Sequence, residues 1–151
     1  MKAVIQRVKQ AAVRIGEKQI AGISQGAVIL AGVQKGDTET TARALADKIY
    51  HLRIFDDPDG KMNCPIAEIG GSFLVISQFT LLGDCRKGRR PSFTESEEPA
   101  KARAVYEAFI AALKGCGVSV SEGAFQETML VEIHNDGPVT FVIEARNGSI
   151  L

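Results

Sequence analysis

Apolar and polar residues alternate along the first part of the chain, which predicts β-strands. Residues 3–8, 12–15 and 19–23 follow this period of two, typical of strands with one buried face. Gly16-Glu17 has the composition of a hairpin turn. The continuous apolar run at 27–33 predicts a strand covered on both faces. We therefore expect the first thirty-odd residues to form a meander that supplies most of a sheet.

Two later segments repeat apolar residues every three or four positions and predict helices. The first follows Gly36-Asp37-Thr38, where Asp37 or Thr38 would cap the free amides of the first turn. Its apolar face consists of Ala42, Leu45, Ala46, Ile49 and Leu52. The second helix begins at Pro99, a residue suited to the first helical position, and stops at Gly115 and Gly117. Its apolar stripe consists of Ala102, Val105, Tyr106, Phe109, Ile110 and Leu113.

The remaining apolar runs complete the sheet. Residues 72–76 predict a buried strand, 118–120 a short strand, and 129–134 and 141–143 a final pair connected by turn residues. Strands outnumber helices and come in runs rather than in βαβ alternation. We therefore predict an α+β fold of a single domain, residues 1–151, with two helices on a mainly antiparallel, curved, barrel-like sheet.

The amino-acid composition limits the functions that are compatible with this chain. The 151 residues contain 18 Lys and Arg against 18 Asp and Glu, so any nucleic-acid contact must come from a local patch. Such a patch lies at Arg86, Lys87, Arg89 and Arg90, which we call the basic loop. It is either a solvated loop or a docking site for an RNA end. Three cysteines without paired spacing favour a reduced, cytoplasmic setting, and no apolar stretch is long enough to span a membrane.

Ser77-Gln78-Phe79-Thr80-Leu81 is the first candidate site. It leaves the end of a buried strand, where a rigid element fixes the position of a loop. One interpretation is that Ser77 and Thr80 cap turns while Phe79 fills the core. The other is that hydroxyls and loop amides face an ester or phosphate while Phe79 packs against a base or ring.

Standard catalytic machinery is missing. A nucleophilic hydrolase usually pairs its nucleophile with a histidine, and the chain has only His51 and His134. His51 suits the end of the first helix, and His134, near the end of a strand, is either exposed or part of a site. We find no zinc motif, phosphate loop or dinucleotide fingerprint. The acidic turn at 56–60 lacks the glutamate of a calcium loop, so we expect neither metal nor cofactor.

The second candidate site is Asn135-Asp136-Gly137-Pro138-Val139-Thr140. These residues suit a surface turn, yet the proline removes a backbone donor that a simple turn would use. An X-Pro bond is also the place where a cis peptide costs little, about 0.5–1 kcal/mol. A Gly-Pro unit held in one isomer would present a rigid backbone surface to a ligand.

Together the two motifs, Ser77–Leu81 and Asn135–Thr140, resemble the signature motifs of the D-aminoacyl-tRNA deacylase family. Further similar segments run along nearly the whole chain: 4–8, 50–55, 60–63, 90–93 and 123–125. Two motifs in the right order within a chain of this length are highly specific. One departure is Gln126-Glu127-Thr128, where the family commonly has Gly or Ala, then Ala, then Asp before the methionine.

The resemblance implies a homodimer that hydrolyses the ester between a D-amino acid and the terminal adenosine of tRNA. It implies that Gly137-Pro138 is cis, enters the active site of the other subunit and excludes L-amino acids by steric clash. Glycine has no side chain to exclude, so glycine mischarged on tRNA(Ala) should also be accepted. The catalytic residues would be Phe79 and Thr80. Substrate-binding residues would be Ser77, Gln78, Leu81, Phe125 and Met129, and residues supporting Gly137-Pro138 would be Arg7, Asn135, Val139 and Thr140.

Two mechanisms remain open for this reaction. Thr80 could attack the ester, but no base lies near it in the sequence. The alternative is that loop amides at Phe79 and Thr80 stabilise the oxyanion while the adenosine 2′-hydroxyl helps to activate water. Two other functions also remain open. One is a non-catalytic, nucleic-acid-binding dimer that uses the basic loop, and the other is an esterase for small molecules.

Overall fold

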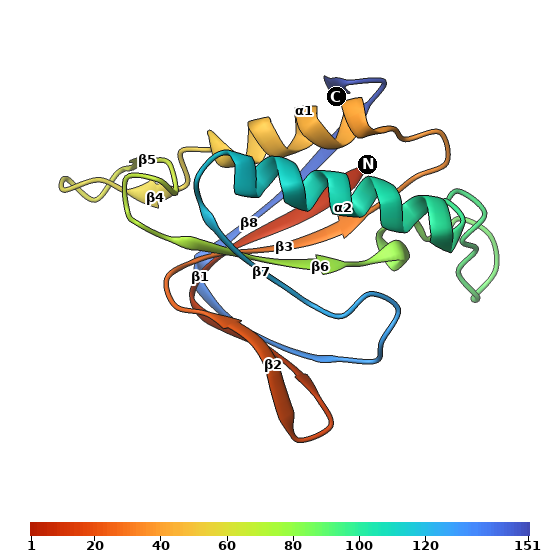
Figure 1. The fold of residues 1–151 in the computed structure, drawn as a ribbon, viewed down its shortest axis with the longest axis horizontal. Helices are drawn as coiled ribbons and strands as arrows, with labels where there is room; N and C mark the ends of the chain where they lie inside the picture. The colour runs from red at the N-terminus through yellow and green to blue at the C-terminus, as the bar shows by residue number, and fades with distance from the viewer.

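Two α-helices lie on one face of a curled seven-stranded sheet in the computed structural model, which describes residues 1–151 (Figure 1). The elements in chain order are β1 (Lys2–Ile15), β2 (Lys18–Ile23), β3 (Gly26–Gly32), α1 (Glu39–Tyr50), β4 (Phe55–Asp56), β5 (Met62–Cys64), β6 (Ser72–Ser77), the 3-10 helix η1 (Phe79–Leu82), α2 (Pro99–Gly115), β7 (Ser119–Glu122), β8 (Leu130–Arg146) and β9 (Ser149–Ile150). The strands follow the order β7-β6-β3-β1-β8-β9, and β2 pairs with β1. Neither helix is both long and apolar enough to cross a membrane.

Strand β1 organises the sheet. It is one strand of 14 residues where the sequence pattern predicted two. Its second half pairs with β2 and its first half with β3, both antiparallel, so the predicted meander is wrong: β3 returns to β1 and not to β2. The β3–β6 and β6–β7 pairs are parallel, and all other pairs in this sheet are antiparallel. The α+β class with a mainly antiparallel, curved sheet is confirmed.

Strand β8 differs from the predicted pair of strands connected by turn residues. The two apolar runs beside Asn135–Thr140 do not form a hairpin, because both pair with β1 in the same direction. Gln6 pairs with Thr140 and Val8 with Asn135, with register shifts on either side of Val8. The four residues between Asn135 and Thr140 therefore bulge out of one long strand. Turn composition cannot distinguish such an excursion from a hairpin, since only the pairing partner differs.

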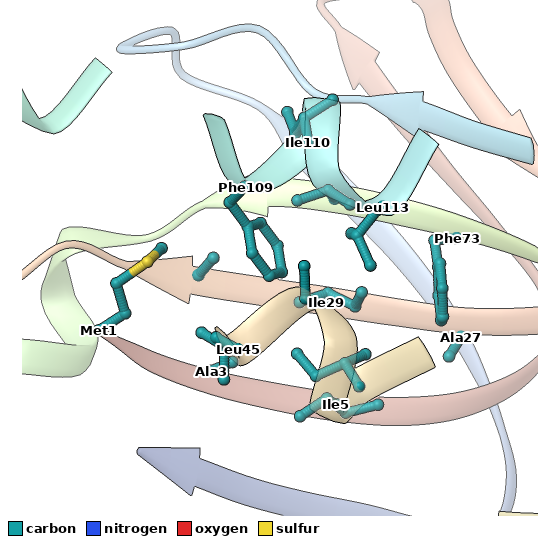
Figure 2. Packing of buried hydrophobic residues seen from close by; sticks show 14 of the residues in the cluster. Met1, Ala3, Ile5, Ala27, Ile29, Leu45, Phe73, Phe109, Ile110 and Leu113 are labelled. Carbon is teal, nitrogen blue, oxygen red and sulfur yellow. The ribbon is translucent and has the colours of Figure 1, made fainter. Parts of the chain in front are cut away.

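The main core lies between the helices and the sheet. Phe109 and Leu113 of α2 and Leu45 of α1 face Ile29 and Phe73 of the sheet (Figure 2). Each of these five side chains is at most 1% exposed, and each contributes about 1.5–3 kcal/mol by leaving water. This packing fixes β6, and with it the segment that follows Ser77.

The start of α1 differs from the prediction. Thr38 occupies the N-cap position, but no side chain caps the helix. The Asp37 carboxylate instead accepts a hydrogen bond from the Gln34 amide at 2.7 Å and pairs with the Met1 ammonium group at 2.6 Å. Asp37 therefore joins the start of the chain to the loop before α1.

Candidate active site

The Ser77–Leu81 motif leaves the sheet where β6 ends. The Gln78 amide donates to the Ala31 carbonyl at 2.8 Å, which continues the pairing with β3 by one residue, and η1 then turns the chain away. Phe79 is 56% exposed, although it packs edge-on against Phe93 with ring centroids 5.0 Å apart. An aromatic ring this exposed, held by a rigid strand, is available to a ligand.

A cavity of about 610 Å³ opens beside this motif. Its lining combines apolar side chains with hydroxyl, amide and carboxylate groups. The residues are Val33, Ile76, Ser77, Gln78, Phe79, Ser96, Glu97, Pro99, Ala102, Phe125, Gln126, Glu127, Thr128, Met129 and Val131. The structure thus brings together five of the predicted site residues from two distant segments of the chain.

The segment after β7 forms the opposite side of the cavity. The Ala124 amide donates to the Met129 sulfur at 3.2 Å, which closes the turn between these residues. The ring of Phe125 lies 5.8 Å from that of Tyr106, and the Arg103 guanidinium lies 5.0 Å from its centroid. Gln126 has a φ of 64°, a left-handed conformation that favours glycine. The family pattern commonly places glycine or alanine at this position.

Other predicted residues lie outside this cavity. Thr80 and Leu81 do not line it, and the Gln78 side-chain amide donates a hydrogen bond to the Thr80 hydroxyl. Gly137 and Pro138 are exposed and also lie outside it. Sequence reasoning missed Ser96, Glu97 and the first turn of α2. The proline at the start of α2 marked the helix but not the cavity, because only the tertiary packing places that turn beside β6.

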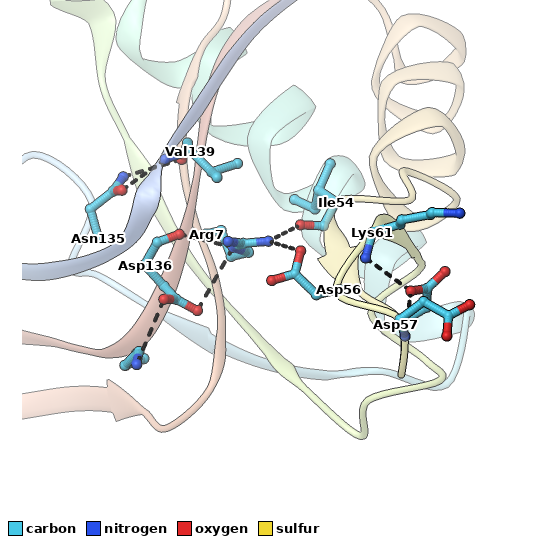
Figure 3. Close-up of polar contacts among 10 residues, drawn as sticks. Arg7, Ile54, Asp56, Asp57, Lys61, Asn135, Asp136 and Val139 are labelled. Carbon is cyan, nitrogen blue, oxygen red and sulfur yellow. Dashed lines mark hydrogen bonds and ion pairs between the residues drawn. The ribbon is translucent and has the colours of Figure 1, made fainter.

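The Gly137-Pro138 peptide bond is cis, the geometry expected from the resemblance, and the loop around it is held by two side chains. Asn135 brackets the loop: its Oδ1 accepts from the Val139 amide at 2.9 Å, and its Nδ2 donates to the Val139 carbonyl at 3.1 Å. Arg7, only 7% exposed, donates from Nε to the Asp136 carbonyl at 2.8 Å (Figure 3). An exposed loop is thereby fixed from the buried side.

No histidine lies in the cavity. His51 contacts Asp47 at the end of α1, and His134 lies beside Gln10 in a separate polar cavity. The carboxylates of the main cavity belong to Glu97 and Glu127. Hydrogen bonds from the Glu98 and Gly36 amides lower the pKa of Glu97, which suits a fixed anion and not a proton acceptor. No group of three His, Cys, Asp or Glu side chains is arranged to hold a metal ion.

The basic loop is closed at its base and lies near Phe79. Asp84 and Ser92 exchange two backbone hydrogen bonds of 2.7 and 3.0 Å. Hydrogen bonds from Arg86 lower the pKa of Asp84 to about 2, so this arginine is already paired. The other three basic side chains, Lys87, Arg89 and Arg90, are exposed and have no ion-pair partner. Phe93 follows the loop and contacts Phe79, so the end of the basic loop lies near the first motif.

The chain is similar to known proteins along nearly its whole length. The sequence profile of the family described as D-Tyr-tRNA(Tyr) deacylase matches residues 4–144. A D-aminoacyl-tRNA deacylase from Heliobacterium modesticaldum is 51% identical over 98% of this chain and 99% of its own length. One from Fervidobacterium nodosum is 51% identical over 97% of this chain and 98% of its own length.

Solved structures give the same fold. A protein named c-Myc DNA Unwinding Element Binding Protein superposes with a TM-score of 0.91 at 35% identity, over 97% of this chain and 99% of that one. A probable eukaryotic D-amino acid tRNA deacylase superposes with a TM-score of 0.78 over 93% of this chain and 97% of that one. Because the two sequences are only 18% identical, this similarity shows the fold alone. The profile match and the two relatives at 51% identity decide the assignment: the chain belongs to the D-Tyr-tRNA(Tyr) deacylase family.

Proposed function

We propose that this D-aminoacyl-tRNA deacylase acts as a single domain, residues 1–151, on the ester that joins a D-amino acid or glycine to the terminal adenosine of tRNA. Glycine mischarged on tRNA(Ala) is the second substrate class. The observation that carries the proposal is the cavity itself. It combines the Phe79 and Phe125 rings, suited to a base, with the Ser77 hydroxyl and the Gln78 amide, and it contains no histidine.

Catalysis then depends on positioning and on backbone dipoles. Phe79 and Thr80 contribute the first two amides of η1, and the first amides of a helical turn have no partner within that turn. Such a donor stabilises a developing oxyanion by about 3 kcal/mol. The Thr80 hydroxyl accepts a hydrogen bond from Gln78, which lines the cavity, so Thr80 positions the substrate through Gln78. It has no neighbouring base and does not attack the ester. The adenosine 2′-hydroxyl helps to activate the water.

Chirality is selected by Gly137-Pro138 of a second subunit. The loop is exposed, it is fixed by Arg7 and Asn135, and it does not line the cavity of its own chain. These three properties support a homodimer in which each loop enters the partner's cavity. A rigid backbone beside Cα clashes with an L side chain and tolerates a hydrogen, which admits D-amino acids and glycine.

The decisive assay compares deacylation of D-Tyr-tRNA, Gly-tRNA and L-Tyr-tRNA. We expect rapid hydrolysis of the first two and protection of the third. Equal rates on the D and L forms would refute selection at Cα, and comparable rates on free amino-acid esters would favour an esterase for small molecules.

One protein variant and one modified tRNA distinguish attack by Thr80 from catalysis assisted by the RNA. Thr80→Ala should retain substantial activity if Thr80 only positions the substrate, whereas near-total loss with intact binding would identify it as the nucleophile. A tRNA ending in 2′-deoxyadenosine should bind and be cleaved poorly. Unimpaired turnover of that substrate would exclude assistance by the RNA.

A second candidate function is binding of nucleic acid without catalysis. Two observations favour it: the three unpaired cations of the basic loop, and the DNA-binding name of the structure at 35% identity. Neutralising Lys87, Arg89 and Arg90 should weaken tRNA binding under either function. The salt slope should fall by about 0.7–0.9 for each phosphate that the protein no longer neutralises. Only the enzyme predicts that changes at Gly137 or Pro138 alter the preference for D over L substrates.

A further inference from the structure

Arg7 connects two segments that are far apart in the sequence. Its Nε donates to the Asp136 carbonyl at 2.8 Å, in the loop that carries Gly137. Its NH1 donates in the opposite direction, to the Ile54 carbonyl and to Asp56 Oδ1, both at 2.9 Å (Figure 3). The proposed selective loop is therefore linked through one guanidinium group to the β4–β5 hairpin.

The hairpin is a firm support. Ile54 and Phe55 are 5% and 2% exposed and belong to the main core, so the carbonyl of Ile54 has a fixed position. At the tip, Asp57 Oδ1 accepts from the amides of Asp59 and Lys61 at 3.0 and 2.9 Å. The hairpin thus holds its shape through its own hydrogen bonds and its burial.

The shape of a guanidinium group gives this link a directional effect. The group is planar, so two acceptors at NH1 determine the direction in which Nε–H points. We propose that Asp56 is a positioning residue for chiral selection: its carboxylate orients Arg7, and Arg7 fixes the backbone that leads into Gly137. This inference rests on the proposed role of Gly137-Pro138 in selecting D-amino acids.

Asp56 is the carboxylate that Arg7 contacts directly. The other nearby carboxylate, Asp136, lies 3.8 Å from Nε and also 3.8 Å from the exposed Lys9 ammonium group. Without Asp56, the buried cation loses its closest anion and turns towards the Asp136 carboxylate. That movement breaks the bond from Nε to the Asp136 carbonyl and releases the loop.

The test uses the chain of residues 1–151 with Asp56→Ala and Asp56→Asn. Asp59→Ala is the matched control, because it removes a carboxylate from the same hairpin without touching Arg7. The first measurement is hydrogen exchange of the Val139 amide, which bonds to Asn135 within the loop. The second is the ratio of kcat/KM for D-Tyr-tRNA to that for L-Tyr-tRNA.

We expect Asp56→Ala to accelerate exchange at Val139 about tenfold and to lower the D-to-L ratio about tenfold, mainly through faster hydrolysis of the L form. Asp56→Asn keeps an acceptor oxygen, so exchange at Val139 should accelerate less and the D-to-L ratio should fall less than in Asp56→Ala. Asp59→Ala should match the unmodified chain. In an Arg7→Gln background, Asp56→Ala should add nothing further, because the guanidinium through which it acts is absent.

Exchange at Val139 that is equal in Asp56→Ala and Asp59→Ala would overturn the role of Asp56. An additive effect of Asp56→Ala in the Arg7→Gln background would overturn it as well. An unmodified chain that hydrolyses D and L substrates equally would instead refute the proposed chiral selection. Because exchange does not depend on activity, the two failures are distinguishable.

Discussion

Replacing Gly137 with alanine tests the geometry of the selective loop most directly. A Cβ at this position would lie 2.6 Å from Cγ2 of Val139, 3.1 Å from its Cβ, and closer still to its backbone nitrogen. Carbon atoms normally approach to about 3.5–4.0 Å. The side chain of Val139 could rotate, but its backbone nitrogen could not, so the loop itself must move.

The cost of this movement follows from what holds Val139. Its amide donates to Asn135 at 2.9 Å and its side chain is 9% exposed, so relief of the clash sacrifices a hydrogen bond and repacks a buried group. The hydrogen bond contributes about 1 kcal/mol, and forced overpacking costs about 1–3 kcal/mol. We therefore expect Gly137→Ala to destabilise the chain by about 2–4 kcal/mol.

Urea denaturation measures that loss, and the D-to-L ratio of deacylation measures its functional result. We expect the ratio to fall, because the displaced backbone no longer excludes the L side chain. Gly115→Ala is the control: a Cβ there meets nothing within 4 Å, and alanine is the better helix former. An unchanged midpoint and an unchanged ratio in Gly137→Ala would refute the steric reasoning.

Three further predictions concern other parts of the site. Gln126→Gly should stabilise the chain by about 0.5–1 kcal/mol in urea denaturation, because glycine adopts the left-handed conformation freely; destabilisation would show that the Gln126 side chain makes a needed contact. Tyr106→Phe removes a buried hydrogen bond of 3.1 Å to the Val75 carbonyl and should cost about 1 kcal/mol without changing the D-to-L ratio. Asp84 has a pKa lowered to about 2, so its pairing with Arg86 stabilises the folded loop above the ordinary pKa near 3.8 and is lost as the pH falls through about 2. A carboxyl-carbon NMR titration should show this low midpoint, and Arg86→Gln should raise it; a midpoint near 3.8 in the unmodified chain would contradict the pairing.

The sequence predicted those elements of the fold that depend mainly on interactions between neighbouring residues. Pro99 and the stripe that follows it placed α2 correctly, since helix geometry itself decides which residues share a face. The turn predicted at Gly16 is also correct, because it depends on the glycine itself, whose φ is 59°. The prediction failed at Asp37, whose carboxylate has a better partner in a distant ammonium group than in the helix beside it.

Part of the candidate site could likewise be predicted from neighbouring residues, and part of it could not. The motif at Ser77 was visible because a buried strand delivers it, and its link to Phe125 came from the resemblance. The role of the segment Ser96–Pro99 could not be predicted, because only packing between layers places it at the cavity. The partners of Arg7 were also invisible. A lone arginine in an apolar strand does not reveal that two carbonyls and a carboxylate surround it.

The pairing of β1 with β8 sets the order in which this protein can be completed during synthesis. Lys2 pairs with Glu144 and Arg14 with Leu130, so the partner of β1 is translated more than a hundred residues after it. At about 5–20 residues per second, β1 waits on the order of ten seconds with one edge unpaired. During that interval Arg7 can already bond to Ile54 and Asp56, whereas its acceptor at Asp136 does not yet exist. A nascent chain therefore holds the residues of its cavity before it holds the loop that we propose makes the reaction selective.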